Sequence, residues 1–193
     1  TKQRHKPDTL CVHAGQEPGG RRERAVPVSQ TTSFMFDSAS HAADLFSLEE
    51  DGYIYTRIGN PTTEVLEKRL AALDGGVGGL CFSSGMAAIS AAVLNIAGSG
   101  DHIVSSSALY GGTVTLFAHT LKRLGIETTF VHPSDSEGFG KAITDKTRLI
   151  FVESVGNPGN DVPDFEELSK IASEADVPVV CDNTIMTPVL FRP

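Results

Sequence analysis

The sequence predicts an α/β fold of three layers, α/β/α, in which helices cover both faces of a mainly parallel β-sheet. From residue 61 onward, short apolar runs alternate with stretches whose apolar residues recur at helical spacing. The first 60 residues show little periodicity and are too long for an ordinary loop. We therefore expect residues 1–60 to form an arm that contacts a neighbouring subunit, and residues 61–193 to begin a large domain.

Local patterns predict each helix. A short helix is expected from about Ser40 to Leu48, and a longer one from Pro61, because Asn60 is a good N-cap and proline fits the first helical position. Asp164 and Glu167 resemble a capping box for the last predicted helix. The apolar stripes of the four main helices are Leu66/Leu70/Leu73, Ile89/Val93/Ile96, Val114/Phe117/Leu121/Leu124 and Phe165/Leu168/Ile171/Ala175.

Short apolar runs predict the strands. They cover residues 80–82, 102–105, 128–131, 148–152 and 178–181. Helices of this length between strands imply right-handed crossovers and parallel pairing. The glycines of 75–79 predict a flexible turn before the first strand, and they match neither a dinucleotide-binding fingerprint nor a phosphate loop. A nucleotide-dependent oxidoreductase is therefore disfavoured.

Composition limits the classes of function. The formal net charge of −8 argues against nucleic acid or an anionic membrane as partner. No apolar run reaches the roughly 20 residues of a membrane span, and we find no signal peptide, so a cytoplasmic location is expected. Cys11, Cys81 and Cys181 lie far apart and are expected to be buried free thiols. The histidines show no ligand spacing, so no metal is expected.

An aromatic and a basic side chain lie close together before the Pro61 helix. Tyr55 and Arg57 are two residues apart, so an extended segment would present both on one side. Arginine offers a fork of donors and tyrosine a directed hydroxyl, which suits a phosphate group. In isolation, such a pair is more often an exposed arginine beside a half-buried tyrosine.

Polar residues also follow the predicted strands, at the edge where open α/β sheets bind ligands. Ser84, Gly85 and Met86 begin a helix after residue 82, and free amides at such a helix start suit an anion. An ordinary serine-capped helix is the alternative. Tyr110 follows the next strand and is suited to stacking on a flat ring.

Two further strand ends supply carboxylates. Glu153 and Asn157 follow the strand at 148–152, where they either orient a ring hydroxyl or shape a turn. Asp182 and Thr184 follow the strand at 178–181. A carboxylate straight after four apolar residues needs a cation, because burying a lone charge is costly. The protonated nitrogen of a pyridine ring is one candidate for that cation, and a helix N-cap is the alternative role for Asp182.

Seven motifs, in order along nearly the whole chain, resemble the fold-type I transsulfuration family, the enzymes of cysteine and methionine metabolism that use pyridoxal phosphate. They lie at 13–18, 30–34, 55–63, 83–89, 109–113, 156–158 and 182–184. Within the family, the motifs at 13–18 and 55–63 look most like O-acetylhomoserine sulfhydrylases. The resemblance implies replacement of acetate by sulfide on O-acetyl-L-homoserine to give homocysteine. Cystathionine γ-synthase, cystathionine γ-lyase and methionine γ-lyase are alternatives.

The resemblance also implies which residues bind the cofactor phosphate. Gly85 and Met86 would bind it through backbone amides, with Ser84 as a weaker contact. Tyr55 and Arg57 would reach the phosphate of an adjacent subunit. A homo-oligomer follows from this implied role, with a homotetramer built as a dimer of active dimers as the expected form.

Other positions would surround the cofactor ring by the same resemblance. Tyr110 would stack on the ring and assist proton movement, and is the one catalytic residue we expect in this chain. Asp182 would keep the ring nitrogen protonated, and Asn157 would lie near the phenolic oxygen. Glu153 and Thr184 are expected as further contacts.

The lysine that the resemblance requires is not among these residues. It implies a Schiff-base lysine about two dozen residues past the motif at 182–184. The lysines at 68, 122, 141, 146 and 170 lie on predicted helices or loops away from the strand ends. We therefore expect the N-terminal portion of a longer enzyme, inactive by itself. The alternative of another class is a non-catalytic fragment or the partner half of a split enzyme.

Overall fold

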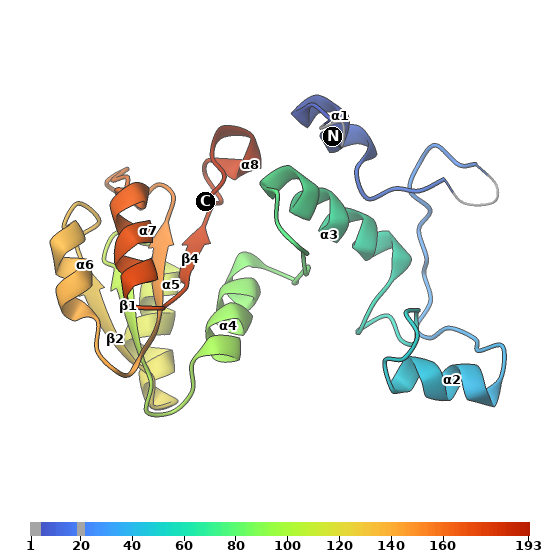
Figure 1. Cartoon of the computed structure of the whole chain (residues 1–193), viewed down its shortest axis with the longest axis horizontal. Helices are drawn as coiled ribbons and strands as arrows, with labels where there is room; N and C mark the ends of the chain where they lie inside the picture. Colours follow the sequence, from blue (N-terminus) through green and yellow to red (C-terminus); the bar gives the residue numbers. More distant parts are fainter. Residues whose placement is uncertain (1–4, 19–21) are drawn as a thin grey trace. The chain divides into compact units, whose positions relative to one another are not determined.

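The structure is a computed structural model that describes residues 5–18 and 22–193. The chain forms two compact units, Thr1–Cys81 and Phe82–Pro193 (Figure 1). In the described part of the first unit the helices are α1 (Pro7–His13), α2 (Ala39–Phe46) and α3 (Pro61–Asp74). The second unit contains α4 (Gly85–Ile96), β1 (His102–Ser106), α5 (Gly111–Thr115), the π-helix η1 (Leu116–Leu121), β2 (Glu127–Val131), α6 (Ser136–Ala142), β3 (Thr147–Glu153), α7 (Phe165–Glu174), β4 (Val179–Asp182) and α8 (Thr187–Leu190).

The four strands form one parallel sheet in the order β2-β1-β3-β4, which confirms the predicted α/β class and the parallel pairing. The strand predicted at 80–82 is wrong. There the Cys81 N–H donates to Glu67 Oε1 at 2.8 Å, and Leu80 is 68% exposed. Because the Cys81 N–H is already bonded to a side chain of the first unit, it cannot pair with a neighbouring β-strand.

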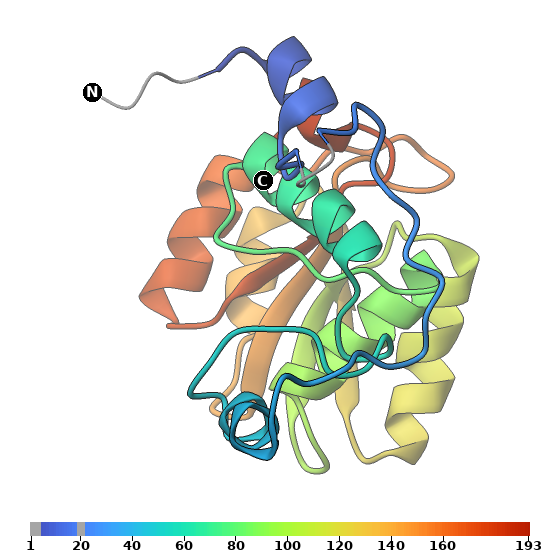
Figure 2. The ribbon, with the colours of Figure 1, turned by 90° about the vertical axis from the view of Figure 1, so that its right-hand side faces the viewer.

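Helices cover both faces of the sheet (Figures 1 and 2). Successive strand residues point to opposite faces, and the buried side chains sort accordingly. Ile103 and Phe151 pack with α4 and η1, whereas Val104 and Ile150 pack with α6 and α7. Phe151 meets Phe117 edge to face, with ring centroids 4.9 Å apart. The predicted three-layer arrangement is therefore confirmed in the second unit.

Capping explains where the main helices begin. Asn60 Oδ1 accepts from the Thr62 N–H at 2.9 Å, and Pro61 is the first residue of α3, as predicted. Asp164 Oδ1 accepts from the Glu167 N–H at 3.0 Å, but the Glu167 carboxylate pairs with Lys170 instead of completing the capping box. Only half of the predicted box is therefore formed.

Some elements differ from the sequence prediction. The predicted helix at 40–48 is α2, and the stripe from Val114 onward becomes α5 followed by η1. The helices α1, α6 and α8 were not predicted. They are short, and α6 contains Gly138 and Gly140, which disfavour a helix; the Asp135 side chain caps it by accepting from the Gly138 N–H at 2.9 Å.

The cysteines are free thiols, as predicted, but only partly buried. Cys11 is exposed, and Cys81 and Cys181 are half-buried. Burial, helped by the Asp182 and Glu153 carboxylates, raises the pKa of Cys181 to about 12. In the described part of the chain, no helix has the length and apolar character needed to cross a membrane.

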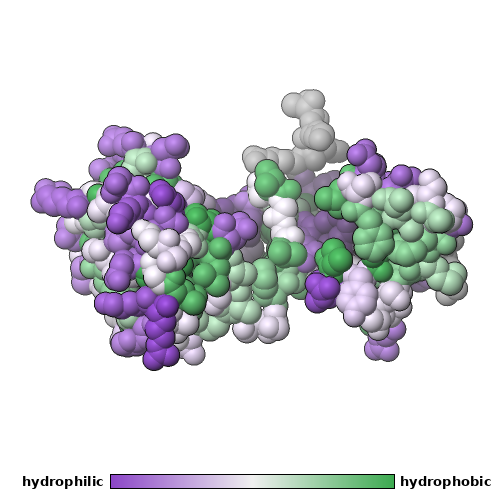
Figure 3. Space-filling view, turned by 90° about the horizontal axis from the view of Figure 1, so that it is seen from below, coloured by the Kyte–Doolittle hydropathy of each residue, from purple (hydrophilic) through white to green (hydrophobic). Residues whose placement is uncertain are grey.

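Apolar side chains remain exposed on the first unit. Met35, Phe46 and Leu48 lie in or beside α2 and are largely uncovered. Figure 3 shows this hydrophobic surface in green in the right-hand part of the view, where α2 lies. The second unit, by contrast, has two clusters of buried apolar side chains, one on each face of the sheet.

Candidate active site

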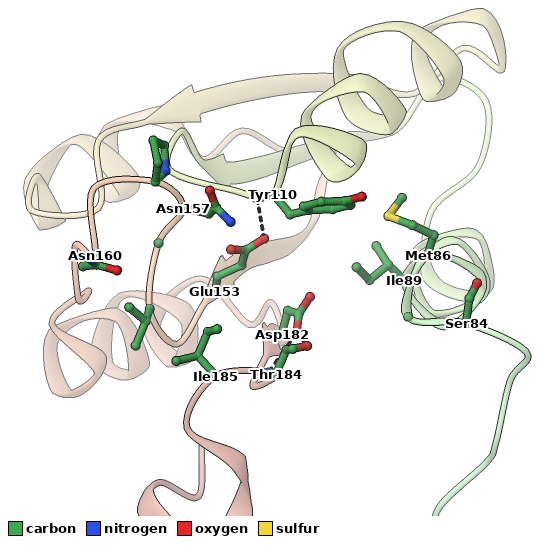
Figure 4. Close-up of a pocket in the computed structure, with 14 residues that line it drawn as sticks. Ser84, Met86, Ile89, Tyr110, Glu153, Asn157, Asn160, Asp182, Thr184 and Ile185 are labelled. Atoms are coloured by element: carbon green, nitrogen blue, oxygen red, sulfur yellow. Dashed lines mark hydrogen bonds between the residues drawn. The ribbon is translucent and has the colours of Figure 1, made fainter.

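A cavity of about 540 Å³ lies in the second unit at the carboxyl ends of the strands (Figure 4). Eight of the ten predicted site residues line it. They are Ser84, Gly85, Met86, Tyr110, Glu153, Asn157, Asp182 and Thr184. The sheet brings them together because parallel strands end at the same edge.

The start of α4 forms one wall of the cavity (Figure 4). Ser84 is the N-cap, and its Oγ accepts from the Ala87 N–H at 3.1 Å. Gly85 and Met86 belong to the first turn of α4. Their backbone N–H groups have no carbonyl acceptor within the helix. With the helix dipole behind them, these amides suit an anionic group. The serine-capped helix and the anion site are thus both compatible with this geometry.

Tyr110 lies at the cavity wall with its ring toward Met86 of α4 (Figure 4). It precedes α5, and its backbone N–H donates to Glu153 Oε1 at 2.7 Å (Figure 4). A Cβ on Gly112 would meet Tyr110 Cε1 at 2.5 Å and Met86 Sδ at 3.3 Å. Glycine at position 112 therefore makes room for the tyrosine ring, which is 54% exposed and free to contact a ligand.

Two carboxylates stand side by side at the ends of β3 and β4. Glu153 and Asp182 are register partners, and Glu153 is only 7% exposed. Burial raises the pKa of Glu153; the Tyr110 N–H opposes this rise and the nearby Asp182 charge adds to it. A cationic group in the cavity would relieve the repulsion between the pair.

Asp182 is held by a local turn. Its Oδ1 accepts from the Thr184 N–H at 3.0 Å and from the Thr184 hydroxyl at 2.5 Å. The alternative role as a helix N-cap is wrong, because Met186 occupies that position for α8. Since both bonds go to Oδ1, the other carboxylate oxygen is left for a ligand.

The loop after β3 approaches the loop after β1. A Cβ on Gly156 would meet the Ala108 Cβ at 2.8 Å, so only glycine allows this close contact. The Gly156 N–H donates to the Asp161 carbonyl at 2.7 Å, which closes the turn that carries Asn157. The amide of Asn157 is thereby placed at the cavity wall (Figure 4).

Tyr55 and Arg57 belong to the first unit and are not among the residues that line this cavity. The expected extended segment is wrong. Tyr55 bridges to Ser33, and the chain then turns, with the Ile58 N–H donating to the Tyr55 carbonyl at 2.8 Å. The side chains still meet, because the Arg57 guanidinium lies over the Tyr55 ring at 5.5 Å from its centroid.

Several residues of the cavity wall were not predicted as site residues. They are Ile89, Val155, Gly156, Pro158, Asn160 and Ile185. Each lies within three residues of a predicted one, so sequence proximity was the available signal, but apolar residues carry no chemistry that marks them. Among the described residues, no lysine lines the cavity, and no group of three His, Cys, Asp or Glu side chains could hold a metal ion.

The geometry defines the kind of ligand that fits. One wall offers helix amides to an anion, and another offers the Asp182 carboxylate to a cation. The Tyr110 ring offers a flat apolar surface between them. A planar aromatic molecule with an anionic group and a protonated ring nitrogen meets all three conditions.

Comparisons with known proteins agree with this geometry. The family model for the Cys/Met metabolism PLP-dependent enzymes matches residues 8–193. O-acetyl-L-homoserine sulfhydrylase from Leptospira meyeri is 52% identical over 189 residues, covering 97% of this chain and 43% of that protein. L-methionine gamma-lyase from Fusobacterium nucleatum is 44% identical over 186 residues, covering 96% and 47%.

A solved chain from Campylobacter jejuni that contains N′-pyridoxyl-lysine-5′-monophosphate superimposes with a TM-score of 0.95 at 40% identity. The match covers 98% of this chain and 47% of that one. The chain thus spans less than half the length of the curated relatives cited above. It belongs to the family of Cys/Met metabolism PLP-dependent enzymes.

Proposed function

We propose that this chain forms part of a sulfhydrylase that replaces the acetate of O-acetyl-L-homoserine by sulfide and releases homocysteine. The observation that carries the proposal is the cavity with an anion-binding helix start at one wall and a carboxylate at another. The 52% identity to the Leptospira sulfhydrylase favours this substrate over those of the other family members.

The residues present fit pyridoxal phosphate. The backbone amides of Gly85 and Met86 would bind its phosphate, with the Ser84 hydroxyl as a further donor. Asp182 would pair with the protonated ring nitrogen through the oxygen that Thr184 leaves free. Asn157 would bind the phenolic oxygen from the cavity wall.

When bound, pyridoxal phosphate supplies an electron sink that stabilises carbanions. The chain supplies orientation and proton movement. Tyr110 lines the cavity with its ring half exposed, and its phenol would carry a proton to or from the substrate. Its ring would cover one face of the cofactor, and Glu153 and Thr184 would hold Tyr110 and Asp182 in place.

We further propose that residues 1–60 act as an arm in a homo-oligomer, with Tyr55 and Arg57 serving the site of an adjacent copy. The adjacent guanidinium and phenol support this role, as does the exposed apolar surface beside α2. Arg57→Ala should weaken cofactor binding about tenfold to a hundredfold, as expected for the loss of a charged phosphate contact. Unchanged affinity in an equilibrium titration with pyridoxal phosphate would refute the arm.

The absence of a lysine from the cavity wall, among the described residues, favours two arrangements. The lysine comes either from further residues of the same polypeptide or from a second polypeptide of a split enzyme. Intact mass together with absorption at about 400–430 nm separates these arrangements. A band that borohydride removes, with the label on the same polypeptide or on a companion, identifies which one supplies the lysine.

The decisive assay uses the complete enzyme, purified with the polypeptide that supplies the lysine, and gives it pyridoxal phosphate, O-acetyl-L-homoserine and sulfide. We expect homocysteine and acetate in equal amounts. Parallel reactions with cysteine as the sulfur donor, and with L-methionine alone, test the synthase and lyase alternatives. Turnover of either alternative substrate in preference to sulfide addition would overturn the proposed substrate while leaving the family assignment intact.

A further inference from the structure

Glu153 holds the turn that carries Tyr110. Its Oε1 accepts from the Tyr110 backbone N–H at 2.7 Å, although the two residues lie 43 positions apart (Figure 4). Tyr110 is the N-cap of α5, so its own N–H lies outside the hydrogen bonds of that helix. Glu153 supplies the acceptor for this N–H, and an unpaired backbone donor would be costly.

The carboxylate is itself firmly placed. Glu153 is the last residue of β3, and β3 is buried between β1 and β4 along most of its length. The backbone on both sides is fixed, since the Ser154 N–H donates to the Asp182 carbonyl at 2.9 Å. Glu153 thus connects the turn after β1 to the most buried strand of the sheet.

The ring of Tyr110 is located by different contacts. It lies against Gly112, where a Cβ would meet it at 2.5 Å, and Met86 Sδ lies beside the same position. Thr113, buried in α5, directs its hydroxyl to Met86 Sδ at 3.7 Å. The backbone of Tyr110 is therefore held by Glu153, whereas its ring lies next to Gly112 and remains half exposed.

We propose that Glu153 is a positioning residue that places Tyr110 for proton transfer by accepting its backbone N–H. The role toward the reaction rests on the proposed function, whereas the anchoring of the turn does not. The carboxylate acts as an acceptor at a fixed distance, so an uncharged acceptor of the same length should replace it. A charged side chain one methylene shorter should not.

Two substitutions separate these properties. Glu153→Gln keeps the length and the acceptor oxygen but removes the charge. Glu153→Asp keeps the charge but withdraws the acceptor from the Tyr110 N–H. Glu174→Ala, an exposed position at the end of α7, is the matched control for loss of a glutamate elsewhere in the same unit.

Hydrogen exchange of the full-length protein, read by mass spectrometry without substrate, tests the anchoring directly. The segment at 107–112 should exchange about tenfold faster in Glu153→Asp, and within about threefold of wild type in Glu153→Gln and Glu174→Ala. Unchanged exchange in Glu153→Asp would overturn the proposal. Equally fast exchange in both Glu153 variants would also overturn it, because charge would then be the property that matters.

Kinetics of the same variants test the consequence for the reaction. Glu153→Asp should lower kcat about tenfold to a hundredfold with KM changed less than about threefold, and Glu153→Gln should restore most of kcat. If KM rises instead and kcat holds, Glu153 binds substrate and the positioning role is wrong. If wild type makes no homocysteine, the proposed function fails, and the exchange result still decides whether Glu153 anchors the turn.

Discussion

The two units of the chain are stabilised in different ways. The second unit packs large apolar side chains on both faces of its sheet, including Phe117, Phe139 and Phe151 at 0–1% exposed. The first unit buries only Leu45 and Leu73 among its described apolar residues and depends on bonds between side chains and backbone. Arg69 Nε, for example, donates to the Ala14 carbonyl at 2.8 Å. This contrast indicates that the second unit carries its own core, while the first leaves most of its apolar side chains uncovered.

The largest expected effect compares one apolar side chain from each unit. Phe151→Ala should cost about 3–5 kcal/mol of unfolding free energy, because it leaves a cavity beside Phe117. Leu66→Ala, on the exposed side of α3, should cost below about 1 kcal/mol. Urea denaturation followed by circular dichroism, with hydrogen exchange to resolve the units, measures both. Similar losses of unfolding free energy in the two variants would contradict this contrast, because Leu66 would then belong to a buried core.

A smaller effect compares the N-caps of the two units. Asn60 also donates from Nδ2 to the Ser29 carbonyl at 3.0 Å, so Asn60→Ala removes both a cap and a long-range bond. Its cost should be about 2 kcal/mol, against about 1 kcal/mol for Asp164→Ala, which removes a cap only. Equal shifts of the denaturation midpoint would show that the bond to Ser29 contributes little to the first unit.

The smallest effect is in the response to acid. Burial lowers the pKa of His102, which bonds Thr147 and Thr129, although the charge of Glu127 opposes this shift. A native base with a lowered pKa binds fewer protons than the unfolded chain does. The second unit should therefore lose stability as the pH falls below about 6.5.

The first unit should respond at lower pH. Bonds from Lys68 and then Tyr53 lower the pKa of Glu64, so its contribution is present above the unfolded value of about 4.5 and is lost as the pH falls through the native one. Denaturation midpoints of wild type, His102→Gln and Glu64→Gln between about pH 7 and pH 3 test this order. Loss of the first unit before the second on acidification would contradict it.

Much of the second unit was predictable because its patterns are local and repeated. The parallel strands, the cap Asp164 and the residues at the strand ends all follow from spacing and side-chain chemistry. The strand at 80–82 failed because a side chain, Glu67, takes the backbone donor of Cys81. Sequence cannot show such a competition, since the two partners lie 14 positions apart and only the fold brings them together.

Long-range contacts set the remaining limit for the site. The chemistry of Tyr110 and Glu153 was recognised, but the bond between them spans 43 positions and joins the turn before α5 to the end of β3. Ile185 and Asn160 were missed because nothing in the sequence distinguishes them from ordinary loop residues. Only their position at the cavity wall marks them. The turn at Tyr55 was missed because alternation alone does not distinguish a strand from a bridge followed by a turn.

The shared strands of the second unit have a consequence for cooperativity. Alternate side chains of β1 and β3 point into the two helical layers. Both layers therefore pack against the same two strands. Melting one layer would expose the strands on which the other depends. We therefore expect the unit to unfold in a single transition, and a ligand held at the strand ends to raise the melting temperature of both layers together.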